Sequence, residues 1–230
     1  METTLAVPLL RSQIDVANRL HQQLRQWKDI DQALETLHTH FPGFDMDSTL
    51  LKVVAVNQLY GTRLYMVVPM ARHVTEVMST SDELEDTELV EQIAAFAGHK
   101  HLSFASKFAH FFIHMERFPI YDAFARNMVA HHLGTHVRTV GTTSPYKAFV
   151  DNIEQLKQRA ALSCSNKELD RYLWLAGLYR LWKRYQNKYE ENTNEKKKLR
   201  MNAEVEALFN DFSSVNAAEL AQLYPWYPEK

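Results

Sequence analysis

The sequence predicts an all-α protein that folds as a two-lobed helical domain. Apolar residues recur at the three- and four-residue spacing of amphipathic helices along almost the whole chain of 230 residues. Hydrophobic residues make up 46% of the chain, including 12 Phe, 10 Tyr and 4 Trp, which is enough for a sizeable core. The 6 glycines and 7 prolines are too few for the many tight turns of an all-β fold.

Local signals mark where individual helices begin. Thr80 and Glu83 have the spacing of a capping box ahead of an apolar run. Ser144 followed by Pro145 is typical of an N-cap with proline at the first helical position, and Asn166 can cap the next helix. We therefore expect helices at 9–27, 30–39, 47–60, 63–78, 82–97, 104–116, 122–133, 145–161, 167–190, 199–211 and 216–222.

Glycine and proline mark the breaks between helices. Gly98 can end the helix before it in the left-handed conformation. Pro119 separates the two helices that flank it, because the residue before a proline is biased away from helical geometry. No strand is expected, apart from a short run at 136–140 that can form one. The single domain, 1–230, is expected to have one lobe at 45–135 that carries the candidate motif and a second lobe at 1–44 and 136–230.

The charge is distributed unevenly along the chain, although its net value is only -2. Residues 99–200 contain 18 Lys and Arg against 9 Asp and Glu, whereas the rest contains 8 against 19. Seven of the eleven histidines also lie in this middle segment. Such a chain can present a basic face to a polyanion, or its acidic and basic helices can pair with each other.

Cysteine content and the apolar segments indicate a reduced, intracellular protein. Cys164 is the only cysteine, which excludes an internal disulfide and a cysteine-only metal site. The start, METTLAVPLLRSQ, lacks the basic and apolar regions of a secretory signal. The most apolar later stretch, 50–71, contains Lys52 and Arg63 and predicts a buried helix pair rather than a membrane span. We expect a cytoplasmic location and no membrane contact.

Residues 103–128, SFASKFAHFFIHMERFPIYDAFARNM, contain two candidate reactive groups. On a helix, Lys107 lies at the edge of an apolar sector that includes Phe104 and Phe108. A lysine at such a border can extend its amine to water. Alternatively the amine faces a cleft, where burial lowers its pKa and frees it as a nucleophile. Asp122 similarly can be a plain N-cap, or an ionised carboxylate that stabilises a developing cation.

The segments ASKFA and FPIYDAFARNM resemble the signature of the helix-hairpin-helix DNA glycosylases. In that family a G-x-K-x-A motif follows a hairpin and precedes a P-x-x-D-x-x-x-R-like segment at the start of the next helix. The resemblance matches Lys107 to the lysine of the bifunctional members and Asp122 to the catalytic aspartate. Arg126 matches the basic residue one turn later.

Two further segments bear on this resemblance. VVAVNQLYGTR resembles the family's earlier helix that ends beside the base pocket, which implies substrate contacts from the residues Asn57, Gln58 and Tyr60. The hairpin reads AGHKHLSFAS where the family usually has L-P-G-V-G. Backbone contacts to phosphate through glycines are thereby replaced by side chains, and the DNA contacts expected are Lys100, His101, Arg126 and His110.

The resemblance implies a DNA glycosylase of base excision repair, a hydrolase that removes a modified base from DNA. Asp122 would stabilise the cationic sugar and Lys107 would attack its anomeric carbon, within about 10 Å of each other across one nucleotide. If Lys107 is not the nucleophile, Asp122 would instead position water, which gives a glycosylase with no lyase step. DNA is the only partner implied, the protein would be a monomer, and no cofactor is expected. Two alternatives stay open: a non-catalytic nucleic-acid-binding module, and an all-α protein-interaction domain.

Paired histidines offer a different kind of site. His110 and His114 are four residues apart, as are His132 and His136, and this spacing on a helix can share a metal. No acidic ligand lies in register with either pair, and H-E-x-x-H is missing. We therefore expect no metal site.

Overall fold

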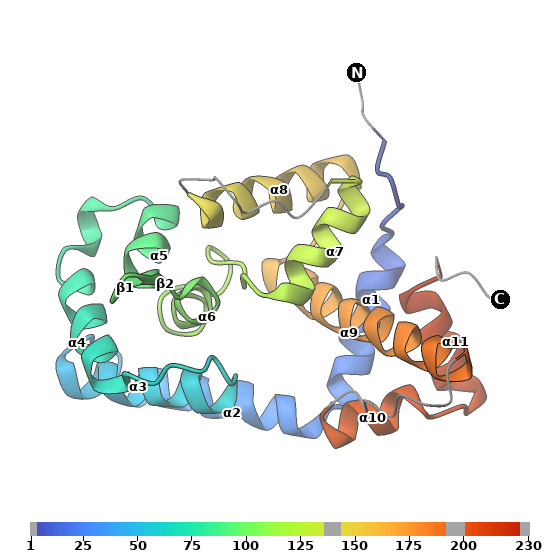
Figure 1. Cartoon of the computed structure of the whole chain (residues 1–230), viewed down its shortest axis with the longest axis horizontal. Helices are drawn as coiled ribbons and strands as arrows, with labels where there is room; N and C mark the ends of the chain where they lie inside the picture. Colours follow the sequence, from blue (N-terminus) through green and yellow to red (C-terminus); the bar gives the residue numbers. More distant parts are fainter. Residues whose placement is uncertain (1–3, 136–143, 192–200, 226–230) are drawn as a thin grey trace.

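The computed structural model is all-α, as the sequence predicts. It describes residues 4–135, 144–191 and 201–225, with the side chains of 188–191 excepted. These ranges contain eleven α-helices, a 3₁₀ turn (Ser81–Glu83) and one two-stranded sheet (Figure 1). The elements are α1 (Arg11–Gln23), α2 (Arg25–His40), α3 (Met46–Leu59), α4 (Val67–Met78), α5 (Asp86–Ala94), β1 (Ala95–Phe96), β2 (His99–Lys100), α6 (Leu102–Phe112), α7 (Ala123–Leu133), α8 (Pro145–Arg159), α9 (Asn166–Glu191), α10 (Ala203–Phe209) and α11 (Ser214–Leu223).

Two groups of helices lie on either side of α6 (Figure 1). On one side α3 packs on α4 and α6, and α5 packs on α6. On the other side α9 packs against α1 and α7, and α1 also contacts α11. Helix α2 contacts both α3 and α6, whereas α8 contacts α5 and α7 and so bridges the two groups.

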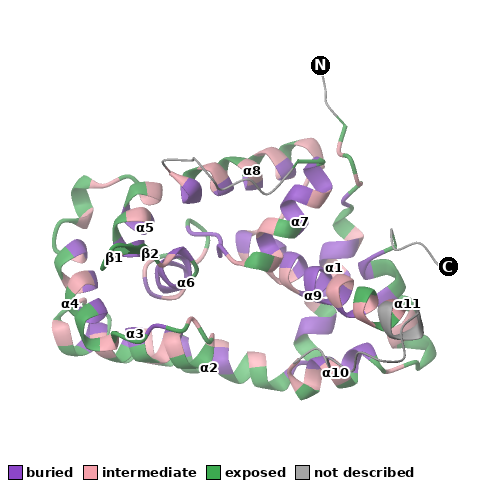
Figure 2. Cartoon of the chain, in the orientation of Figure 1, coloured by how far each residue is buried: buried purple, intermediate pink, exposed green. Residues whose placement is uncertain are grey.

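Helix α6 is a core helix that is buried on nearly every side (Figure 2). Its rings Phe104, Phe108 and Phe112 stack along one face with centroid separations of 5.9 and 5.4 Å. Only Ser103 is exposed among its residues, and Lys107 is buried with the apolar side chains. A helix that is apolar on most sides requires several neighbours, and α2, α3 and α5 provide the helix contacts of α6.

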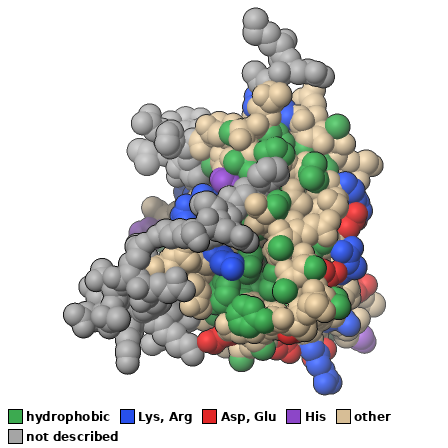
Figure 3. All heavy atoms as spheres, turned by 90° about the vertical axis from the view of Figure 1, so that its right-hand side faces the viewer, with side chains coloured by type: hydrophobic (Ala, Val, Ile, Leu, Met, Phe, Trp, Pro, Cys, Tyr) green, Lys and Arg blue, Asp and Glu red, His purple; other side chains and the backbone are tan. Residues whose placement is uncertain are grey.

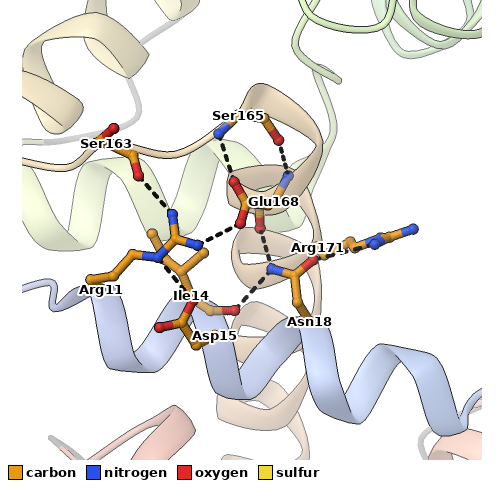
Figure 4. A network of polar contacts seen from close by, with 8 residues as sticks. All are labelled: Arg11, Ile14, Asp15, Asn18, Ser163, Ser165, Glu168 and Arg171. Atoms are coloured by element: carbon orange, nitrogen blue, oxygen red, sulfur yellow. Dashed lines mark hydrogen bonds and ion pairs between the residues drawn. The ribbon is translucent and has the colours of Figure 1, made fainter.

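Polar contacts attach the first turn of α9 to α1 (Figure 4). Arg11 bonds Glu168 through Nη2 at 2.6 Å, and the Asn18 amide donates to the Glu168 carbonyl at 3.1 Å. Glu168 and Ser165 also form a capping box, with each side chain accepting the other's backbone N–H. The expected cap, Asn166, is instead the first helical residue. These contacts fix the start of α9, which carries part of the cavity described below.

Several local expectations were wrong. The Thr80–Glu83 pattern does not form a capping box, because Thr80 donates its hydroxyl to the Val77 carbonyl and α5 starts only at Asp86. The expected helix 9–27 breaks at Leu24, whose backbone is extended. Leu24 is buried, so tertiary packing overrides the continuous apolar pattern there.

A short β-hairpin with a two-residue turn replaces the expected end of helix 82–97. Strands β1 and β2 pair antiparallel, and the turn residues Ala97 and Gly98 have φ of +50° and +77°. Two consecutive positive φ angles are those of a type I′ turn, which matches the twist of a hairpin. Gly98 is thus left-handed as expected, but it serves the hairpin rather than a helix end. The run at 136–140 lies outside the described residues.

The end of the molecule formed by α10 and α11 has hydrophobic side chains at its surface among polar ones (Figure 3). Phe212 and Val215, from the turn between these helices and the start of α11, are exposed. Among the described residues, no helix combines the length and apolar character needed to cross a membrane.

Gly134 ends α7 in the left-handed conformation, with φ of +69°, and provides a stability test. A Cβ at this position would lie 2.6 Å from the Ala6 Cβ, in the segment whose Ala6 N–H bonds the His132 carbonyl. Gly134→Ala should therefore lower the free energy of unfolding by the left-handed penalty of about 1–2 kcal/mol plus a clash of about 1 kcal/mol or more.

Gly98→Ala is the matched control in a denaturant titration. It has the same sign of φ, but a Cβ there would meet nothing within 4 Å. Equal losses of stability in the two variants would show that the contact with Ala6 contributes nothing.

Candidate active site

A cavity of about 470 Å³ lies between the two groups of helices, beside α6. Its wall comes from distant parts of the chain: α1 and α2, the end of α3, α6, the segment before α7, and the first turns of α9. The lining includes Trp27, Asp31, Tyr60, Ser103, Lys107, His110, Phe111, Asp122, Phe124, Asp170, Arg171 and Trp174. The volume suits a small, largely enclosed ligand.

The Lys107 amine faces this cavity from the middle of α6. Its Nζ lies 4.0 Å from Asp122 Oδ2 and donates to Ser103 Oγ at 2.9 Å. The side chain is only 7% exposed, and burial lowers the pKa of the amine, opposed by the charges of Asp122 and Asp170. The expected approach of Lys107 and Asp122 to within about 10 Å is therefore confirmed. A buried amine with a lowered pKa has a larger neutral, nucleophilic fraction than a surface lysine.

Asp122 uses its two carboxylate oxygens differently. Oδ1 accepts the Ala125 N–H at 2.8 Å and so caps α7, as the sequence predicts. Oδ2 is the oxygen nearest to Lys107. Capping therefore fixes the orientation of the carboxylate and leaves one oxygen available to the cavity.

The segment that precedes Asp122 is held against α6 and α8 by three side chains. The Ser106 hydroxyl accepts the Tyr121 N–H at 2.9 Å, and His110 Nδ1 donates to the Phe118 carbonyl at 2.9 Å. Tyr146, from α8, donates its hydroxyl to the Pro119 carbonyl at 3.0 Å. Ser106, His110 and Tyr146 are all buried, so these bonds are shielded from water. Together they set the distance between Lys107 and Asp122.

Asp170 is a third ionisable group of the site, and the sequence did not single it out. It projects from α9 into the cavity wall and is near enough to Lys107 for each to shift the pKa of the other. Burial, followed by the charge of Asp122, raises the pKa of Asp170 to about 8, against the opposing effect of Lys107. Asp170 is thus mostly protonated at pH 7 and can donate a hydrogen bond. The only sequence signal is an acidic residue four positions before Trp174 on one helix face.

Aromatic rings form the other wall. Trp27 and Trp174 meet edge to face with centroids 4.8 Å apart, and Tyr60 packs on Phe111 at 5.1 Å. The Tyr60 hydroxyl donates to Asp31 at 3.3 Å, and Asp31 also pairs with Arg171 at 3.4 Å. Within the described part of the chain, Trp27 Nε1 is buried without a hydrogen-bond partner. Such a wall offers flat apolar surface to a planar ligand.

The three expected substrate contacts are placed differently. Tyr60 lines the cavity, but Asn57 and Gln58 are not among its lining residues. The Asn57 amide donates to the Leu64 carbonyl and its oxygen accepts the Leu64 N–H, so Asn57 shapes the loop after α3. Gln58 is exposed on α3.

The four residues expected to contact DNA differ in their exposure and in their distance along the fold from the cavity. Lys100 is exposed at the hairpin and pairs with Glu91 at 3.4 Å, while His101 is half-buried beside it. Arg126 lies over the Tyr121 ring, next to the candidate site. His110 is only 4% exposed, and its bond to Phe118 gives it a positioning role rather than the phosphate contact expected of it.

No group of three or more His, Cys, Asp or Glu side chains among the described residues could hold a metal ion. His110 and His114 do not share a helix face, because α6 ends at Phe112. His136 lies outside the described residues.

Comparison with known proteins gives one match. Residues 13–117 match the family model HI_0787_N, which is described as an N-terminal domain. The matched segment includes Lys107 and the Trp27 and Tyr60 walls of the cavity, and it ends before Asp122 and Asp170. No curated protein and no solved structure matches the chain significantly.

Buried His110 should make folding stability depend on pH. Burial lowers its pKa to about 4, so it stays neutral in the folded state while the unfolded chain takes up a proton below about pH 6.5. Stability should therefore fall as the pH is lowered from 6.5 towards 4, with a contribution from His110 of up to about 2 kcal/mol at pH 5.

Denaturant unfolding at pH 7.5 and pH 5 measures this dependence. His110→Asn can keep an N–H for the Phe118 carbonyl, and it should lose less stability on acidification than the wild type. His114→Asn, at an exposed position, should behave like the wild type. The same pH dependence in all three proteins would contradict the assignment to His110.

Proposed function

We propose that this protein is a DNA N-glycosylase with lyase activity, which removes a modified base from DNA by means of Lys107 and Asp122. One observation supports it most: a buried amine lies 4.0 Å from a carboxylate oxygen at the edge of a cavity of about 470 Å³. The resemblance to helix-hairpin-helix DNA glycosylases names the same two residues. The succession α5, hairpin and α6 ahead of Lys107 is in keeping with that resemblance.

The base would enter the cavity after rotating out of the DNA duplex. Enzymes that react at the sugar or base of a duplex nucleotide generally extrude it, because the stacked base shields the reacting atoms. Trp27 and Trp174 would pack on the flat faces or edges of the base. Protonated Asp170 would donate a hydrogen bond to an acceptor on the base, and its wall position suits that contact.

In the reaction, the bond between the sugar C1′ and the base nitrogen breaks, and the base leaves with the bonding electrons. Asp122 Oδ2 would stabilise the positive charge that develops on the sugar. The neutral Lys107 amine would then bond C1′ and lose one proton. The C1′–O4′ bond would break and O4′ would take up a proton, which opens the sugar ring and leaves a protonated Schiff base. The departing base takes up a proton, for which protonated Asp170 is a source. Elimination of the 3′ phosphate and hydrolysis would release the cut strand and regenerate the amine.

The burial of Lys107 favours an enzyme over a module that only binds nucleic acid. Binding phosphate requires an accessible cation, and a lysine that is 7% exposed is poorly suited to that task. Removing an amine from water is costly unless its neighbours compensate. Asp122 and Ser103 provide that compensation here. We propose that the protein acts as a monomer, in the cytoplasm, on DNA.

Borohydride trapping tests the proposal. Duplexes that carry different modified bases are incubated with the protein, and borohydride reduces any Schiff base to a stable protein–DNA adduct. Lys107→Ala should form no adduct, and neither should Lys107→Arg, because a guanidinium stays protonated. In the wild type the rate of adduct formation should rise with pH as Lys107 deprotonates, and level off below the ordinary pKa of 10.5 because burial lowers its pKa.

Lys52 supplies a matched control for this experiment. It is also fully buried, and burial lowers its pKa to about 8, but it lies on α3, is not among the cavity-lining residues and bonds the Gly43 carbonyl. Lys52→Met should keep the adduct if it folds. An adduct that persists in Lys107→Ala would move the nucleophile elsewhere. Wild-type protein that forms neither adduct nor abasic product on any duplex would rule out the proposed function.

Asp122→Asn separates the capping role of Asp122 from its chemical role. Asparagine caps helices about as well as aspartate, so loss of the cap should cost less than about 1 kcal/mol, and any further loss of stability measures what the Asp122 charge contributes to the burial of the Lys107 amine. Base excision should nevertheless slow by about 100-fold or more, because the amide carries no charge to offset the developing cation. Circular dichroism and single-turnover excision measure the two effects. Excision at the wild-type rate would reduce Asp122 to a structural cap.

A further inference from the structure

A second pocket, of about 440 Å³, lies between α7 and α9, two helices that also contribute to the candidate active site. Arg180 and Arg184 line it from α9, one helical turn apart, while Asn127 and His131 line it from α7. Phe124 lines both the pocket and the cavity. The pocket therefore continues the site along α9 rather than opening on an unrelated face.

The two arginines give the pocket an uncompensated positive charge. None of its lining residues is acidic, and no carboxylate in residues 4–135, 144–187 or 201–225 lies within ion-pair distance of Arg180 or Arg184. Burial and the neighbouring charge of Arg184 lower the pKa of the half-buried Arg180, while Tyr224 opposes this. Two like charges this close are stabilised by an anion between them.

The neutral lining groups also suit an anion. Burial, with the charge of Arg180, lowers the pKa of His131 to about 4, so its ring is neutral near pH 7. Its Nε2 lies 3.1 Å from the Tyr224 hydroxyl, which leaves Nδ1 for another contact. Asn127 and Thr135 are exposed and add hydrogen-bond donors. Planar guanidinium groups with supporting amide and hydroxyl donors are the usual partners of phosphate oxygens.

Gly177 keeps this pocket close to the cavity. A Cβ on Gly177 would lie 3.1 Å from the Phe124 Cβ and 3.1 Å from the Met128 Cγ, so a larger residue would require these neighbours to shift by a few tenths of an ångström. From Asp170 to Arg180 is ten residues of continuous helix, about 15 Å. That separation brings the arginines within reach of phosphates a few nucleotides from the base held in the cavity.

We propose that Arg180 and Arg184 bind a backbone phosphate of the DNA strand that carries the extruded base. The inference rests on the proposed function for its ligand, since it takes DNA as the substrate. The pocket binds phosphate diester irrespective of sequence and holds the strand in register with the cavity.

The test is DNA binding by Arg180→Ala/Arg184→Ala, measured by fluorescence anisotropy on an abasic-analogue duplex at several salt concentrations. Affinity near 0.1 M salt should fall about tenfold or more, because charge-assisted hydrogen bonds to phosphate are lost. The slope of log K against log salt should become shallower by about one to two, since fewer counterions are released. The DNA affinity of Arg180→Lys/Arg184→Lys should lie between those of the wild type and the alanine variant, because lysine keeps the charge but not the planar donors.

Arg25→Ala/Arg72→Ala is the matched control, since it removes two exposed arginines from α2 and α4. It should change affinity much less. Equal affinity and slope for wild type and the pocket variant would overturn the inference, as would loss of inorganic phosphate or dAMP binding with DNA binding unchanged. With DNA at saturating concentration, the pocket variant should still form the borohydride adduct. Absence of adduct in the wild type, with the pocket effect on DNA binding intact, would instead count against the proposed chemistry alone.

Discussion

The burial of α6 on nearly all sides is the constraint on which the rest of this structure depends. Its phenylalanine rings require helices around them, and those helices leave the Lys107 side chain only 7% exposed. The hydrogen bond and the ion pair of the amine therefore come from within the protein, from the Ser103 hydroxyl and the Asp122 carboxylate. Both groups of helices contribute residues to the wall of the resulting cavity.

The site contains buried polar and ionisable groups whose burial costs free energy, and the packing of the surrounding fold offsets that cost. Asp170 is a carboxyl group whose burial favours the neutral form, and Lys107 is an amine whose burial does the same. The unpartnered Trp27 Nε1 in the wall adds a desolvation cost of about 1–3 kcal/mol. A fold optimised for stability alone would replace such groups with apolar ones. Their presence together at one cavity is typical of a site that binds or reacts.

Periodicity and caps predicted most helices, and the short range of the motif allowed Lys107 and Asp122 to be paired before the fold was known. Asp122 could be recognised because an N-cap is a local signal. Asp170 could not, because its place in the cavity wall depends on the packing of α9 against α1 and α7, which no local pattern encodes. Asn57 illustrates the converse error: its amide is polar and well placed in sequence, yet the loop after α3 uses both of its hydrogen-bonding ends. His110 likewise had the charge pattern of a surface residue but is buried.

The cavity wall combines one contiguous stretch of the chain with residues that are remote in sequence. Lys107 and Ser103 lie on α6, and Asp122 caps the next helix, α7, whereas Trp27, Tyr60, Asp170 and Trp174 come from parts of the chain remote in sequence. The reactive pair is thus inherited as one contiguous stretch of chain. Substitutions in the distant helices can reshape the ligand-facing wall one side at a time without altering that stretch. With the exception of Asp170, which shifts the pKa of Lys107, the shape of the wall can therefore change independently of the stretch that holds Lys107 and Asp122.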